Sequence, residues 1–86
     1  MAYELVIQQS ASKALQRIDK PVRKRIAAAI DKFKDDPQPA NATQVISVPG
    51  AWRIRVGDYR VLYEVHDLEL TVLVVKIAHR STVYDR

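Results

Sequence analysis

The chain has 86 residues, enough for one domain with one hydrophobic core. Apolar residues make up 48% of it, which excludes a disordered chain, and no segment approaches the roughly 18 apolar residues of a membrane span. The 14 Lys and Arg residues outnumber the 10 Asp and Glu residues, and the net charge of +4 indicates either an anionic partner or a mildly basic protein without one. Cysteine is absent, which excludes thiolate chemistry and favours the cytoplasm. We expect residues 1–86 to form a single cytoplasmic domain.

The N-terminal half predicts a strand followed by two helices. Residues 3–8 contain β-formers and predict a short strand. Ser10 or Ser12 can then cap a helix. Apolar residues recur at steps of three or four, at Leu15, Ile18, Val22, Ile26, Ile30 and Phe33. Pro21 fits a first helical turn and not an interior, so we expect helices over about 11–18 and 21–35.

The C-terminal half predicts strands. Residues 43–48 alternate weakly, and strands over 52–56 and 59–66 flank Gly57-Asp58. The nearly unbroken apolar run 70–78 is typical of a central strand buried on both faces. The order β-α-α-β-β-β-β predicts an α+β fold with both helices on one side of a mainly antiparallel sheet. Something else, such as the end of the chain or a partner, must then cover the other side.

The predicted hairpin has a register that can be derived. Glycine tolerates positive φ, so Gly57-Asp58 suits a two-residue turn that pairs Arg55 with Arg60. Because paired residues share a face and side chains alternate, Arg53, Arg55 and Arg60 fall on one face. The other face, which must be the core side, receives Ile54, Val56, Val61, Tyr63 and Val65. A three-residue loop would slip the pairing and move Arg60 away.

The three arginines suggest a phosphate site. Like charges directly opposite one another destabilise a sheet, and such local costs tend to mark functional positions. The guanidinium fork matches phosphate oxygens bidentately. The alternative is a solvated face on which Glu64 and Asp58 partly neutralise the arginines. Trp52 can stack on a base. Strand alternation, however, places it on the same face as Ile54 and Val56, which favours a position in the core.

The hairpin, the hydrophobic strand and the terminal segment together resemble the RelE/ParE toxin superfamily. The resemblance rests on residues 52–65 (WRIRVGDYRVLYEV), His79-Arg80 and Val83-Tyr84, and covers essentially the whole chain. It implies a RelE-like fold and a messenger-RNA interferase that cleaves at the ribosomal A site, inhibits translation and is held inactive by a cognate antitoxin in a hetero-oligomer. It also implies the site residues, which are Arg53, Arg55, Arg60, Arg80 and Tyr84.

The implied reaction is metal-independent attack of a 2′-OH, which leaves a 2′,3′-cyclic phosphate. Arginine can stabilise charge on the phosphate but is a poor base, because its pKa exceeds about 12. The best-known RelE site has lysines where this chain has Arg53 and Arg55, so one candidate base is missing. Tyr84 can replace it if arginines lower its reference pKa of about 10. His79 is the alternative base.

The sequence indicates no cofactor and leaves other functions open. We expect no metal, since no His, Asp or Glu residues have ligand spacing on one element, and two glycines cannot form a glycine-rich phosphate loop. The first alternative is a ParE-like DNA gyrase inhibitor that cuts no RNA. The second is a non-enzymatic module that binds an acidic partner or represses DNA through an antitoxin complex.

Overall fold

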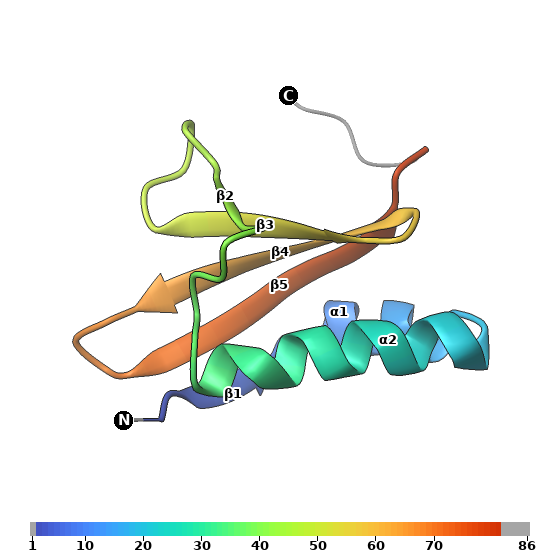
Figure 1. The fold of residues 1–86 in the computed structure, drawn as a ribbon, viewed down its shortest axis with the longest axis horizontal. Helices are drawn as coiled ribbons and strands as arrows, with labels where there is room; N and C mark the ends of the chain where they lie inside the picture. The colour runs from blue at the N-terminus through green and yellow to red at the C-terminus, as the bar shows by residue number, and fades with distance from the viewer. Residues whose placement is uncertain (1, 82–86) are drawn as a thin grey trace.

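The helices and strands follow one another in the predicted order (Figure 1). The computed structural model describes residues 2–81. The elements are β1 (Glu4–Ile7), α1 (Gln9–Gln16), α2 (Lys20–Asp31), the 3₁₀ turn η1 (Lys32–Lys34), β2 (Thr43–Gln44), β3 (Ala51–Val56), β4 (Tyr59–His66) and β5 (Thr71–His79). The predicted α+β class is therefore confirmed.

The five strands form one sheet in the order β1-β5-β4-β3-β2. β1 runs parallel to β5 and all other neighbours are antiparallel, as the predicted mainly antiparallel sheet requires. Figure 1 shows α1 and α2 on the same side of the sheet. No helix within residues 2–81 has the length and apolar character to cross a membrane. One face of the sheet is thus covered by helices and the other is not.

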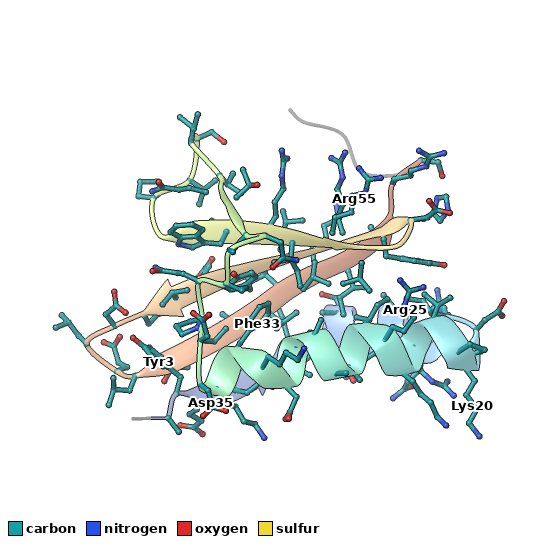
Figure 2. All side chains as sticks on the ribbon, viewed as in Figure 1. Tyr3, Lys20, Arg25, Phe33, Asp35 and Arg55 are labelled. Carbon is teal, nitrogen blue, oxygen red and sulfur yellow. The ribbon has the colours of Figure 1, made fainter. Side chains whose placement is uncertain are left out.

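The core lies between the helices and the sheet (Figure 2). Ile26 and Ile30, four residues apart on α2, are 0% and 1% exposed, as the apolar stripe predicts. The sheet contributes Ile54, Val61, Tyr63, Val72, Val74 and Ile77 to the same core. Trp52 is half-buried and packs against this core, which confirms its predicted place.

An aromatic pair links η1 to the middle of the sheet. The Phe33 and Tyr63 rings stack with their centroids 4.0 Å apart, and both side chains are 0% exposed. The Tyr63 hydroxyl donates a hydrogen bond of 2.8 Å to the Pro37 carbonyl oxygen. Burial first, and then the charge of Asp36, raises the pKa of Tyr63 well above its ordinary value. The segment after η1 is therefore tied to the sheet through a neutral, buried phenol.

The predicted start of the first helix was wrong. The N-cap is Gln8, which makes no side-chain capping hydrogen bond, and Ser10 and Ser12 lie inside α1. The Ser12 N–H donates to the Gln8 carbonyl at 2.9 Å, because the chain turns into the helix directly after β1. Pro21 lies in the first turn of α2, as predicted.

The strand predicted over 43–48 was too long. β2 is limited to Thr43–Gln44, and the chain then turns, with the Ala51 N–H donating to the Val48 carbonyl at 3.1 Å. The turn signal at Pro49-Gly50, where Gly50 has a φ of +81°, ends the pairing earlier than the weak alternation suggested.

β5 is not the central strand and is not buried on both faces. β4 occupies the centre of the sheet, and β5 alternates between buried Val72 and Val74 and half-buried Leu73. A register shift after Leu62 places Val75 as an extra residue in β5, and the exposed Lys76 and buried Ile77 follow. β5 therefore packs only one of its faces against the core, and the β-bulge at Val75 interrupts the alternation of its side chains.

Candidate functional site

The hairpin of β3 and β4 has the predicted register. Arg55 pairs with Arg60, Ile54 with Val61 and Val56 with Tyr59 across the two-residue turn. Gly57 has a φ of +58°, a conformation that costs glycine little and other residues more. The register places Arg53, Arg55 and Arg60 on the face of the sheet opposite to Ile54 and Val61. Arg55 points away from the helices in Figure 2.

These arginines line a cavity of about 210 Å³ on the face away from the helices. Its lining consists of Asn41, Thr43, Arg53, Ile54, Arg55 and Arg60. Arg55 is exposed, whereas Arg53 and Arg60 are half-buried. A pocket lined by guanidinium groups presents many N–H donors and a positive potential, so it suits an anion such as a phosphodiester. We call this cavity, with its six lining residues, the arginine cavity.

Three residues at or near this site were not singled out from the sequence. Asn41 and Thr43 line the arginine cavity because β2 pairs with β3, with Thr43 opposite Arg53. Lys76 pairs with Leu62 and is exposed, so the register places it on the same face. Lys76 is the only charged residue within the predicted strand 70–78, and that interruption is the signal that could have identified it.

Arg80 lies at the turn of the hairpin. Its N–H donates a hydrogen bond of 2.7 Å to the Asp58 carbonyl, and its Nε is 3.7 Å from the Asp58 Oδ1 atom. Both side chains are more than 60% exposed, so this ion pair contributes little to stability. The main-chain hydrogen bond places Arg80 beside the Gly57-Asp58 turn, next to the strand that carries Arg60.

His79 does not share the face of the arginines. It pairs with Tyr59, whose other partner is Val56, so the register places its side chain on the face that the helices cover. Its ring meets the Tyr59 ring edge-on at 5.2 Å between centroids, and its Nδ1 atom accepts the Ser81 N–H at 3.2 Å. The alternative base considered from the sequence is thus turned away from the arginine cavity.

The remaining predicted site residue, Tyr84, lies outside the described residues 2–81. Within those residues, no group of three or more His, Asp or Glu side chains is arranged to hold a metal ion. The polar side chains that line the arginine cavity are the three arginines, Asn41 and Thr43.

Comparison with known proteins identifies the family. The sequence model of the ParE toxin of the type II toxin–antitoxin system parDE matches residues 5–84. A putative RelE-like toxin protein of Escherichia coli is 28% identical over 88 residues, covering 99% of this chain and 93% of the relative.

Solved structures agree with this assignment. The archaeal RelE–RelB complex from Pyrococcus horikoshii matches with a TM-score of 0.84 and 26% identity, covering 96% of this chain and all of that chain. A mutant of E. coli RelE in complex with an antitoxin RelBc peptide matches with a TM-score of 0.75 and 28% identity, covering 98% and 92%. The chain therefore belongs to the ParE toxin family of type II toxin–antitoxin systems, within the RelE/ParE superfamily, and has the RelE fold.

Proposed function

We propose that this toxin is a metal-independent endoribonuclease that cleaves ribosome-bound messenger RNA and thereby inhibits translation. The observation that carries the proposal is the arginine cavity, in which three guanidinium groups from one hairpin line a space of about 210 Å³. Guanidinium groups bind phosphate bidentately and keep their charge at every physiological pH. The likeness to a putative RelE-like toxin protein at 28% identity supports the same conclusion.

The residues have distinct roles in the proposed reaction. Arg53 and Arg55 bind the scissile phosphate, and Arg60 stabilises the charge that builds on it in the transition state. Tyr84 removes the proton from the 2′-OH. The 2′-oxygen then bonds to phosphorus, the bond from phosphorus to the 5′-oxygen breaks, and Arg80 stabilises the leaving oxygen as it takes up a proton from water. The products are a 2′,3′-cyclic phosphate and a free 5′-OH end.

The place of His79 supports Tyr84 as the base. The side chain of His79 lies on the helix-covered face, and its Nδ1 atom is engaged by the N–H and the hydroxyl of Ser81. A base must come within hydrogen-bonding reach of the proton that it abstracts. His79→Gln should therefore leave cleavage within a few fold of the wild type.

Cleavage of ribosome-bound message by the purified full chain tests the proposal. Primer extension should reveal cuts, and the upstream fragments should end in a 2′,3′-cyclic phosphate. Arg60→Ala should reduce the rate by about 100- to 1,000-fold, the usual cost of removing one group that stabilises transition-state charge. Lys32→Ala is the matched control, because this exposed cation lies on η1, outside the arginine cavity. Full cleavage by Arg60→Ala would overturn the assignment.

We also propose a cognate antitoxin that holds the toxin inactive in a hetero-oligomer. The support is that the matching structures from P. horikoshii and E. coli are complexes with RelB or with an antitoxin peptide. Co-expression with the product of an adjacent short reading frame should yield a stable complex and abolish toxicity. Failure of every neighbouring product to bind would contradict this proposal.

Gyrase inhibition is the second candidate function, and the family description favours it, since the matching sequence model is that of ParE toxins. Such a toxin would block supercoiling by purified gyrase and leave ribosome-bound message intact. Measuring supercoiling and message cleavage on the same preparation separates the two functions. We favour the ribonuclease because the arginine cavity suits the phosphodiester of an RNA strand.

A further inference from the structure

The arginine cavity contains two neutral polar side chains besides its arginines, and neither has a role in the proposed reaction. Asn41 and Thr43 line it from the segment that leads into β2. Arginine donates hydrogen bonds and accepts none, and its phosphate contacts carry no information about sequence. With the arginines engaged on the phosphate, a side chain that both donates and accepts can add contacts that distinguish one base from another.

The main chain beside Asn41 is anchored by neighbouring residues. The Ala42 N–H donates to the Pro39 carbonyl at 2.9 Å, and the Ala42 side chain packs against the core. Thr43 follows in register opposite Arg53. The main chain that carries Asn41 is therefore already positioned, so less backbone freedom is lost when this side chain meets a ligand.

The amide of Asn41 is available to a ligand. Within residues 2–81 it makes no hydrogen bond to another side chain or to the main chain. It offers one acceptor and two donors in a plane, which is the pattern that reads base edges bidentately. Sequence-specific recognition of RNA relies on such contacts with unstacked, single-stranded bases.

The size of the cavity limits what Asn41 can meet. Pockets for small-molecule ligands usually enclose about 300–1,000 Å³, and this one encloses about 210 Å³. Its small size therefore limits its direct contacts to the bound phosphate and the groups next to that phosphate. With the phosphate on the arginines, the base of the adjacent nucleotide is the group left to meet the amide.

We propose that Asn41 hydrogen bonds the base of the nucleotide next to the bound phosphate and so sets the sequence preference of this toxin. This rests on the proposed RNA substrate and adds a specificity-determining residue to it. Thr43, with a hydroxyl that donates and accepts, contacts the ribose of the same nucleotide.

The test compares the full-length wild type with Asn41→Ala, Asn41→Asp and Gln44→Ala. Gln44 is the matched control, because it is an exposed amide in β2 whose side chain alternates to the other face, and it does not line the cavity. Two quantities are measured: the base frequencies around cuts in ribosome-bound messages, and the affinities for four short homopolymeric oligoribonucleotides by fluorescence anisotropy.

Asn41→Ala should reduce the preference among bases about tenfold, as expected for the loss of one bidentate contact, with the loss concentrated on the base that the wild type prefers. Asn41→Asp should change which base is preferred, since a carboxylate accepts and does not donate. Gln44→Ala should match the wild type in both measurements.

The outcomes separate this inference from the proposed function. An unchanged preference in Asn41→Ala, an equal loss in Gln44→Ala, or a wild type with no base preference in either measurement would overturn the inference, while continued cleavage leaves the ribonuclease proposal standing. If the wild type cuts no message but binds oligoribonucleotides with a preference that Asn41→Ala removes, the ribonuclease proposal fails and the role of Asn41 stands.

Discussion

The two faces of the sheet differ sharply, although the same strands form both. On the helix-covered face, Ile54 is 3% exposed and Val61 is 0% exposed. One residue along each strand, on the other face, Arg55 is exposed and Arg60 half-buried. Strand alternation alone assigns neighbouring residues to the two faces. Residues of the packed core and residues of the proposed phosphate-binding site therefore occupy neighbouring positions in the chain.

This arrangement predicts that substitutions will separate into two classes. Changes on the covered face remove packed apolar atoms and lower the free energy of unfolding. Changes on the arginine face remove exposed or half-buried charged side chains rather than packed apolar atoms, so we expect them to weaken the proposed RNA binding at a smaller cost in stability. This separation into two classes depends on the pairing register of β3 with β4, which the Gly57-Asp58 turn sets.

Phe33→Ala should have the largest effect on stability. The Phe33 ring is 0% exposed and stacks on Tyr63, so its removal should cost about 3–5 kcal/mol. Domains of this kind have total stabilities of about 5–15 kcal/mol, so a large part of the stability would be lost. Urea unfolding followed by circular dichroism measures the change. Phe33→Leu, which keeps more of the volume, should cost less, and equal costs for both variants would contradict a packing role.

Gly57→Ala tests the turn that separates the two faces. Gly57 has a φ of +58°, a conformation that costs other residues about 1–2 kcal/mol. A Cβ atom there would lie 3.7 Å from the Arg25 Nη1 atom, which is ordinary contact, so the cost comes from the backbone. Gly57→Asn is the control, because asparagine adopts this conformation more readily. Thermal unfolding should rank the variants glycine, asparagine, alanine, and an equal loss in both would point to a steric cause.

The sequence was sufficient to predict the register of the hairpin because the residues that determine this register are close together in the chain. A two-residue turn and alternation define the pairing of Arg55 with Arg60 without reference to the rest of the chain. The helical stripe is local in the same sense, and Ile26 and Ile30 are buried as it predicts. The family resemblance supplied Arg80, whose place at the turn depends on Asp58.

The missed features depend on contacts between distant segments. Asn41 and Thr43 join the site only because β2 adds to the edge of β3. Lys76 reaches the arginine face because a bulge shifts the alternation of β5 against β4. Neither strand addition at an edge nor the position of a bulge is encoded by residue spacing alone, so periodicity could not place these side chains.

Tyr63→Phe should show that a residue of the covered face makes the stability of the protein fall at alkaline pH. Burial, and then Asp36, raises the pKa of Tyr63 above its ordinary value near 10. Above about pH 10 the unfolded chain therefore loses a proton that the folded chain keeps, and the free energy of unfolding falls as the pH rises. Phenylalanine lacks this proton but also lacks the hydrogen bond to the Pro37 carbonyl oxygen.

Tyr63→Phe should thus be less stable by about 0.5–1.5 kcal/mol at pH 7, and the difference should shrink as the pH rises beyond 10. Urea unfolding at several pH values measures it. Tyr3→Phe is the matched comparison, because a hydrogen bond to Asp67 at the surface also raises the pKa of Tyr3, and its effect should be smaller. A constant difference between pH 7 and pH 11 for Tyr63→Phe would contradict the linkage.

Arg55→Gln should have the smallest effect on stability, and it should raise the free energy of unfolding rather than lower it. Arg55 and Arg60 are direct cross-strand partners, and opposed like charges cost a sheet about 0.2–1 kcal/mol. Neutralising Arg55 should therefore stabilise the fold by a few tenths of a kcal/mol, and the gain should diminish at high salt because screening weakens the repulsion. The same variant should bind RNA more weakly.

Lys76→Gln is the control for this last change. Lys76 is exposed on the same face, but its partner on β4 is Leu62, so neutralising it relieves no directly opposed charge. Urea unfolding at low and high salt should show a gain for Arg55→Gln alone. If both variants gain equally, the relief comes from lowering the net charge of the whole protein. If Arg55→Gln is stabilised and yet binds RNA more weakly, the paired arginines favour anion binding at the expense of stability. The covered face would then stabilise the fold, and the arginine face would bind the ligand.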